Sequence, residues 1–229
     1  AQILKDEKNQ SHIHTSEDDW KDQTYFLFTM DPALIPHLLF PVGSMTKPQV
    51  REYAEQKGLT VARKKDSQGI CFVGNQGYGN FIEQHVSADK IREQQGLLKR
   101  YPSGEVMATH NGIHHFTFGQ SKGLGMSHHE KLFVIKIEAD TKTVWIGDEQ
   151  YLFQDHVEVV DPHYLDQIQD GETLRVKIRY AHRGALAKVF KTDKGLRFDF
   201  IEPQRAVTPG QAAVMYRDRQ LVGGGWITV

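Results

Sequence analysis

Cys71, the only cysteine among the 229 residues, lies in the stretch RKKDSQGICFVG (63–74). Three cations precede the thiol, and two glycines, Gly69 and Gly74, flank it. Neighbouring cations can lower the pKa of a thiol and favour the thiolate, which is the form that attacks electrophiles and accepts sulfur. A lone cysteine is also commonly a buried, unreactive apolar side chain. The residues alone leave both interpretations open.

A second candidate is the glycine-rich stretch GQSKGLGM (119–126), which contains Lys122. Backbone N–H groups and a cation in such a loop can bind a phosphate group. The stretch lacks the spacing and the Lys-Ser/Thr ending of a Walker motif. A structural turn that opens a β-barrel is therefore the favoured interpretation.

Twelve histidines raise the question of a metal site. The candidates are His12 with His14, His114 with His115, and His128 with His129 and Glu130. Adjacent side chains on a strand point to opposite faces, so paired histidines cannot easily share one ion. No second ligand cluster has a spacing that completes a site, and we predict no metal.

The charges are distributed unevenly along a chain whose net charge is only −1. Residues 175–205 contain nine Lys or Arg and three acids. Within this segment, Arg179 and Tyr180 offer a cation and a stacking ring, a combination that suits nucleic acid. A polyanionic partner bound in one place would explain the segment, and so would a solvated strand face.

The helical signals lie in residues 45–104. The stretch TKPQ (46–49) is typical of a helix N-terminus with a capping box, and Gly58 would end that helix. A second helix is expected from Asn80. Cys71 lies in the loop between the two predicted helices.

After about residue 100 the hydrophobic period changes to two, as in KLFVIKIEADTKTVWIG (131–147). Six or more short strands without intervening helices predict a closed antiparallel barrel or a compact sandwich. Residues 1–20 are polar and predict a loop or a disordered lead. The predicted fold class is α+β, with a small helical central domain followed by an antiparallel β-barrel domain.

Composition restricts the class of protein further. No apolar run approaches the about 20 residues of a membrane span, and the N-terminus shows no pattern of a secretory signal. A single cysteine excludes an internal disulfide framework and fits a reducing compartment. We expect a cytoplasmic protein without membrane contact.

Five ordered stretches together resemble the bacterial tRNA-uridine 2-sulfurtransferases, also called tRNA-specific 2-thiouridylases. They are KDQTYFL (21–27), LFPVGSMTKPQVR (39–51), KKDSQGICFVG (64–74), GQSKGLG (119–125) and VTPGQAAVMY (207–216). The resemblance covers about residues 20–229. Ser121 departs from the pattern, because the family usually has Arg at this place.

The resemblance implies that the 2-keto oxygen of the wobble uridine in tRNAs for Lys, Glu and Gln is replaced by sulfur. ATP with Mg²⁺ activates that oxygen, and a cysteine persulfide then delivers the sulfur. A sulfur-relay protein or a cysteine desulfurase loads the persulfide, and Cys71 corresponds to the cysteine that carries it. The tRNA-contacting positions of the family correspond to Lys21, Asp22, Gln23, Arg179, Tyr180 and Gln211.

On this resemblance we expect residues 1–44 to be the end of a nucleotide-binding catalytic domain, with a disordered N-terminal part. Residues 45–104 would form the helical central domain with the catalytic Cys loop, and residues 105–229 the tRNA-binding barrel. The ATP-binding loop and a second cysteine would belong to an N-terminal domain that this sequence lacks. We therefore expect the chain to be an inactive fragment that binds no cofactor itself, and the aromatics of TYFLF (24–28) to pack against that domain.

The alternative interpretation is a stand-alone RNA-binding module that docks tRNA without catalysis. Cys71 discriminates between the two, because a module that only binds RNA has no need of a persulfide-forming thiol.

Overall fold

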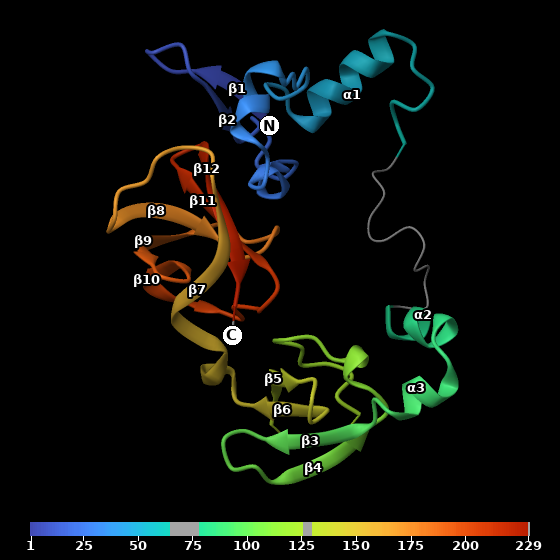
Figure 1. The fold of residues 1–229 in the computed structure, drawn as a ribbon. Coiled ribbons are helices and arrows are strands. Elements are labelled where there is room, and N and C mark those ends of the chain that lie inside the picture. The colour runs from blue at the N-terminus through green and yellow to red at the C-terminus, as the bar shows by residue number, and fades with distance from the viewer. Residues whose placement is uncertain (65–77, 126–129, 229) are drawn as a thin grey trace. The chain divides into compact units, whose positions relative to one another are not determined.

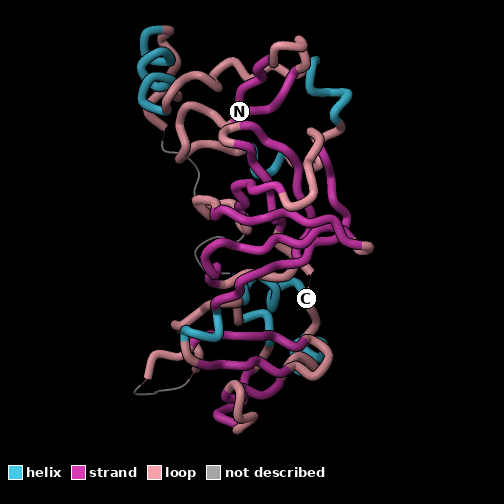
Figure 2. The backbone as a smooth tube through the Cα atoms, turned by 90° about the vertical axis from the view of Figure 1, so that its left-hand side faces the viewer, coloured by secondary structure: helices cyan, strands magenta, loops and turns pink. Residues whose placement is uncertain are grey.

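The structure is a computed structural model that describes residues 1–64, 78–125 and 130–228. The chain divides into two compact units, one formed by residues 1–65 with 155–229 and the other by residues 66–154. Figure 1 shows the elements of both units, and Figure 2 shows that strands predominate over helices. Within the described residues, no helix has both the length and the apolar character that a membrane crossing requires.

Six strands of the first unit close into an antiparallel barrel (Figure 1). The strands are β7 (Phe153–Tyr164), β8 (Glu172–Lys177), β9 (Ala185–Thr192), β10 (Gly195–Arg205), β11 (Ala212–Arg217) and β12 (Gln220–Ile227). They pair in the order β12, β11, β8, β9, β10, β7, and β12 also pairs with β7. This last pairing closes the ring, so that the barrel leaves no long unpaired edge.

Alternation of apolar and polar residues explains the inside of the barrel. In β8, Leu174 and Val176 are buried, whereas Arg175 between them is exposed. The buried residues pack with Val189 of β9 and Phe198 of β10 in one core cluster. The hydrophobic period of two thus produces the predicted barrel, and the fold class is confirmed.

Three consecutive glycines, Gly223–Gly225, let β12 lie between β11 and β7. A Cβ built on Gly223 would lie 2.1 Å from the carbonyl oxygen of His163 on β7. The residue also has a φ of +146°, a conformation that residues with side chains rarely adopt. Glycine at this position is therefore a condition for the closure of the barrel.

The N-terminal residues form a hairpin of β1 (Gln2–Lys5) and β2 (Ser11–His14). The hairpin joins the barrel sheet, because His14 pairs with Gln220 of β12. The prediction of a loop or disordered lead is wrong for these strands. The sequence signal for these strands is weak, because Ile13 is the one fully buried residue of β2. Pairing with the barrel sheet stabilises the hairpin instead.

Two short 3₁₀ helices, η1 (Thr24–Leu27) and η2 (Pro32–His37), follow the hairpin and cover the outside of the barrel. Tyr25 and Phe28 are buried in a cluster with Val214 and Tyr216 of β11. The expectation that the TYFLF aromatics pack against an additional domain is wrong for Tyr25 and Phe28. The barrel itself covers these two rings, whereas Phe26 is 58% exposed.

Helix α1 (Lys47–Gln56) confirms the predicted start and stop signals. The Gln49 side chain accepts hydrogen bonds from the backbone nitrogen of Thr46 at 2.8 Å and from its hydroxyl at 3.0 Å. Gly58 follows the helix with a φ of +70°, the left-handed conformation that commonly ends helices. The capping residues therefore set both ends of α1.

The second unit combines two helices with a small sheet. Its elements are α2 (Tyr78–His85), α3 (Ala88–Arg92), β3 (Gly96–Arg100), β4 (Val106–His110), η4 (Ile113–His115), β5 (Phe133–Glu138), β6 (Thr143–Gly147) and η5 (Glu149–Leu152). The sheet order is β4, β3, β6, β5, with β3 parallel to β6. Buried Leu98, Val134, Val144 and Ile146 form its core.

This division differs from the domain boundaries predicted from the sequence. Helix α1 lies in the first unit, although its sequence signals grouped it with α2. Strands β4 to β6 lie in the second unit, although their alternation grouped them with the barrel. A period of two is the same in both sheets, so the pattern carries no sign of where one sheet ends and another begins.

The Gly223→Ala substitution is expected to lower the free energy of unfolding by about 3 kcal/mol, because it combines backbone strain with a clash against β7. Gly58→Ala is the matched control. Gly58 also has a positive φ, but a Cβ at this position would have no atom within 4 Å, so the loss there should be only about 1 kcal/mol. Urea unfolding followed by tryptophan fluorescence measures both, and equal losses would contradict the close approach of β12 to β7.

Candidate nucleic-acid interface

Three segments that are distant in the sequence meet on the first unit. The Phe26 ring of η1 stacks on the Tyr180 ring that follows β8, with 5.0 Å between the ring centroids and 27° between the planes. The Tyr25 hydroxyl donates a hydrogen bond to the carbonyl oxygen of Ala212 at 3.0 Å. Residues 24–27, 179–180 and 211–212 are therefore neighbours in space.

Asp22 is a buried carboxylate, only 4% exposed. One of its oxygens accepts a hydrogen bond from the Ser16 backbone nitrogen at 2.9 Å, and the other accepts one from the Thr24 hydroxyl at 2.5 Å. The Thr24 hydroxyl also lies 3.2 Å from the Tyr216 hydroxyl, and burial raises the pKa of Tyr216. Asp22 thus holds the turn together from inside.

The residues on either side of Asp22 point the other way. Lys21 and Gln23 are exposed, so their side chains can reach a partner while the carboxylate between them fixes the backbone. Of the three adjacent residues that the sequence predicted to contact tRNA, Asp22 is placed to position the other two.

Arg179 and Gln211 occupy two further predicted positions. The Arg179 guanidinium is half-buried and donates to the carbonyl oxygens of Arg205 at 3.2 Å and Ala206 at 3.5 Å. Gln211 is exposed, and its carbonyl oxygen accepts a hydrogen bond from the Ile227 nitrogen at 2.8 Å. Both residues are held by backbone contacts to the barrel, which restricts their positions.

A cavity of about 780 Å³ lies beside the stacked rings. Predicted residues Asp22 and Tyr180 both line it, together with Trp20, which is 83% exposed. Three acids, Asp19, Asp22 and Asp218, face four cations in the lining, namely Arg175, Lys177, Arg183 and Arg219. Because the Asp22 carboxylate is buried and hydrogen-bonded, the accessible wall is predominantly basic.

His182 adds no positive charge to this wall near pH 7. Burial lowers the pKa of His182 below its usual range, and nearby Arg179 and Lys177 lower it further. Its Nδ1 accepts a hydrogen bond from the Gly184 nitrogen at 3.2 Å, and its Nε2 lies 3.1 Å from the Gln204 side-chain oxygen. The neutral ring therefore braces the corner between β8 and β9.

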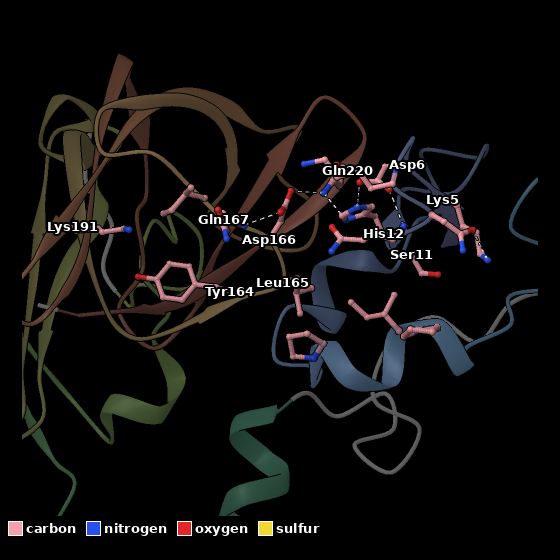
Figure 3. Close-up of a pocket in the computed structure, with 17 residues that line it drawn as sticks. Lys5, Asp6, Ser11, His12, Tyr164, Leu165, Asp166, Gln167, Lys191 and Gln220 are labelled. Carbon is pink, nitrogen blue, oxygen red and sulfur yellow. Dashed lines mark hydrogen bonds and ion pairs between the residues drawn. The ribbon is translucent and has the colours of Figure 1, made fainter.

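A larger cavity of about 1400 Å³ lies along the β1–β2 hairpin, and Figure 3 shows its lining. Asp6, His12, Gln220 and Asp166 form a chain of polar contacts of 2.8–3.4 Å on its wall. It contains none of the residues that the family resemblance predicted to contact tRNA. We take the smaller cavity as the candidate site, because it combines cations, rings and two of the predicted residues.

Two further sequence candidates remain. Cys71 falls outside the described residues. The glycine-rich turn is held by Gln120, whose side chain accepts from the Thr117 nitrogen and donates to the Lys122 carbonyl oxygen, both at 2.8 Å. The next described element after this turn is the strand β5, and a phosphate-binding loop would instead be followed by the N-terminus of a helix.

Sequence reasoning missed the role of Phe26 and the contribution of Arg219 to the cavity. Arg219 donates a hydrogen bond to the Ser16 carbonyl oxygen and lies 3.8 Å from Asp19, which ties the turn between β11 and β12 to the N-terminal segment. The exposed aromatic beside KDQ was a usable signal for Phe26. No local pattern marks Arg219, because its partners are about 200 residues away.

A closed barrel whose basic cavity is flanked by exposed rings is typical of a protein that binds a polyanion. Three family models match successive parts of the chain. Their descriptions are tRNA methyl transferase HUP domain for residues 1–75, tRNA methyl transferase PRC-barrel domain for residues 80–148, and aminomethyltransferase beta-barrel domain for residues 154–227.

Curated proteins named tRNA-specific 2-thiouridylase MnmA are similar over most of the chain. The one from Acidithiobacillus ferrooxidans is 41% identical over 92% of this chain and 60% of its own length. Those from Deinococcus radiodurans and Aquifex aeolicus are 39% and 36% identical over 94% and 99% of this chain and 56% and 62% of their own lengths. The chain belongs to the tRNA-specific 2-thiouridylase family, and it spans about three fifths of the length of these relatives.

The Asp22→Ala substitution is expected to lower the free energy of unfolding by about 3 kcal/mol, because two hydrogen bonds to a buried carboxylate are lost and their donors remain unpaired. Gln23→Ala, at the adjacent exposed position, should change it by no more than about 0.5 kcal/mol. Urea unfolding of the purified chain measures both. A small effect of Asp22→Ala would show that the carboxylate does not hold the turn.

Proposed function

We propose that this chain is part of an enzyme that thiolates the 2-position of the wobble uridine in tRNAs for Lys, Glu and Gln. The meeting of η1, Tyr180 and Gln211 beside the basic cavity is the observation that carries the tRNA-binding part of this proposal. The names of the relatives support thiolation. The family-model descriptions mention methyl transfer, but thiolation also gives the lone cysteine a chemical role.

The proposed tRNA-binding surface consists of Lys21, Gln23, Arg179, Tyr180 and Gln211. The cations of the neighbouring cavity would neutralise phosphates, which supply most of the salt-sensitive affinity for nucleic acid. The stacked Phe26 and Tyr180 rings would receive an unstacked base, and Gln23 would contact the target uridine. Asp22 acts as a positioning residue beneath this surface.

Sulfur transfer is proposed for Cys71. Its persulfide would carry the transferable sulfur, loaded by a sulfur-relay protein or a cysteine desulfurase. The terminal sulfur attacks C2 of the activated uridine, the C2–O bond breaks, and the oxygen leaves together with the group that activated it. A second thiolate then attacks the Cys71 sulfur, which forms a protein disulfide and leaves the outer sulfur on the tRNA; reduction of that disulfide by an external thiol restores the enzyme.

ATP dependence is part of the same proposal. The first described element after the glycine-rich turn at 119–125 is a strand, and no described stretch offers a phosphate-binding loop, so we derive no step through ATP from these residues. We propose that ATP with Mg²⁺ binds, and that the second thiol lies, in the part of the relatives that this chain does not match. The cytoplasm is the proposed place of action, because tRNA is the proposed substrate.

The Arg179→Ala substitution in the complete protein should weaken tRNA binding at least about tenfold and reduce the slope of log affinity against log salt by about 1. Arg197→Ala is the matched control, because Arg197 lies on β10 in an ion pair of 2.6 Å with Asp199. Filter binding of tRNA over a series of salt concentrations measures both. An unchanged slope for Arg179→Ala would remove this residue from the tRNA contacts.

The Cys71→Ser substitution in the complete protein should abolish thiolation while the tRNA affinity stays within about twofold, since the change removes only the sulfur carrier. Retardation of thiolated tRNA on mercury-containing gels measures the product. Thiolation at the wild-type rate by Cys71→Ser would contradict the assigned chemistry. Tight tRNA binding by a wild-type protein that never thiolates would instead favour the RNA-binding module.

A further inference from the structure

Helix α2 and the 3₁₀ helix η4 bring three ligand-type side chains together in the second unit. Glu83 comes from α2, and His114 and His115 come from η4. The Nε2 atoms of His115 and His114 lie 2.8 and 3.3 Å from the same carboxylate oxygen of Glu83. One ligand atom from each of the three residues lies within 4.8 Å of the other two.

His114 and His115 can bind one ion together, although the sequence predicted that adjacent histidines could not easily do so. That prediction places adjacent side chains on opposite faces of a strand, whereas His114 and His115 lie in a 3₁₀ helix. Their ring centroids are 4.2 Å apart with an interplanar angle of 41°, so both rings face the same carboxylate. The local backbone therefore permits two consecutive histidines to act together.

Glycines hold both rings in place. A Cβ on Gly79 of α2 would lie 2.4 Å from Nδ1 of His115, and a Cβ on Gly112 would lie 2.2 Å from Cε1 of His114. Both distances are shorter than side chains tolerate. Each imidazole therefore packs against the backbone of a glycine, where any other residue would clash with the ring. The Nε2 atom of each ring points at Glu83.

These three side chains are partly accessible to solvent, and the neighbouring His110 has other hydrogen-bond partners. The side chain of His114 is 11% exposed, and those of His115 and Glu83 are about one third exposed. The neighbouring His110 is occupied, because its Nδ1 accepts from the Gly112 nitrogen at 3.1 Å and its Nε2 lies 3.0 Å from the Lys142 carbonyl oxygen. The cluster is thus a three-ligand group that solvent can still reach.

We propose that Glu83, His114 and His115 bind one divalent transition-metal ion of the Zn²⁺ class. Two imidazoles and a carboxylate suit zinc better than Mg²⁺ or Ca²⁺, which prefer oxygen ligands. Metal–ligand bonds of about 2.1 Å in tetrahedral geometry place ligand atoms about 3.4 Å apart, so the His115–Glu83 contact has to open by only about half an ångström. A fourth position remains for water or another ligand.

The ion would connect α2 to η4 across about 30 residues of chain. Hydrogen bonds from His115 and His114 hold the pKa of the Glu83 carboxyl below its usual range, which favours the charged carboxylate as a ligand. Metal binding would replace two hydrogen bonds by three coordinate bonds to the same atoms. The ion would then stabilise the second unit, and this stabilisation would rise with the logarithm of the ion concentration above the dissociation constant.

The test uses the metal-free 229-residue chain without an affinity tag, titrated with ZnCl₂ in a calorimeter and with CoCl₂ in a spectrophotometer. We expect one ion per chain and the visible absorption bands of a four-coordinate cobalt ion. Glu83→Gln and His115→Ala should each weaken binding at least about tenfold. Gly79→Ala, which keeps every ligand and displaces only the His115 ring, should weaken it as well.

His156→Ala is the control for loss of a histidine, because exposed His156 pairs with the adjacent Asp155 at 2.6 Å and belongs to the first unit. It should bind zinc like the wild type. Circular dichroism checks that each variant is folded. If His115→Ala does not fold, Glu83→Gln and Gly79→Ala decide the question. The proposal is overturned if the wild type binds no zinc at micromolar concentrations, or if the folded Glu83→Gln and Gly79→Ala variants bind it with unchanged affinity.

Discussion

Burial of strand β11 on both of its faces is the constraint on which the first unit depends. Ala213 and Met215 point into the barrel core, while Val214 and Tyr216 point outward. An outward apolar face of this kind would be exposed on an isolated barrel, and exposed apolar surface needs a partner. The N-terminal segment, residues 1–37, is that partner, so the barrel and the segment that precedes it form one folding unit.

This packing has a direct consequence for the proposed function. The same contacts that cover β11 set η1 beside Tyr180, and the buried Asp22 then determines the course of the turn around it. A buried carboxylate is tolerated here because both of its oxygens accept hydrogen bonds. Exposed Lys21 and Gln23 are therefore presented by a rigid support rather than by a loose loop, which favours specific binding.

The sequence was sufficient for elements whose signals are local. The cap at Thr46, the stop at Gly58 and the alternation in β8 each depend on neighbours within a few residues, and the structure confirms them. Contacts between distant segments could not be predicted in this way. The hairpin at residues 2–14 depends on β12 some 200 residues later, and the approach of His114 to Glu83 requires a 3₁₀ turn at a place where the prediction of no metal had assumed a strand.

The proposed function requires the surface around Phe26 to face the anticodon loop of tRNA. Replacement of Phe26 by a photo-crosslinking phenylalanine in the complete protein, followed by mapping of the adduct, tests it most directly. Ile201, exposed on β10, provides the control position. We expect an adduct at or next to the wobble nucleotide from position 26 and little from position 201. Adducts from position 26 confined to the acceptor arm, or equal yields from both positions, would contradict it.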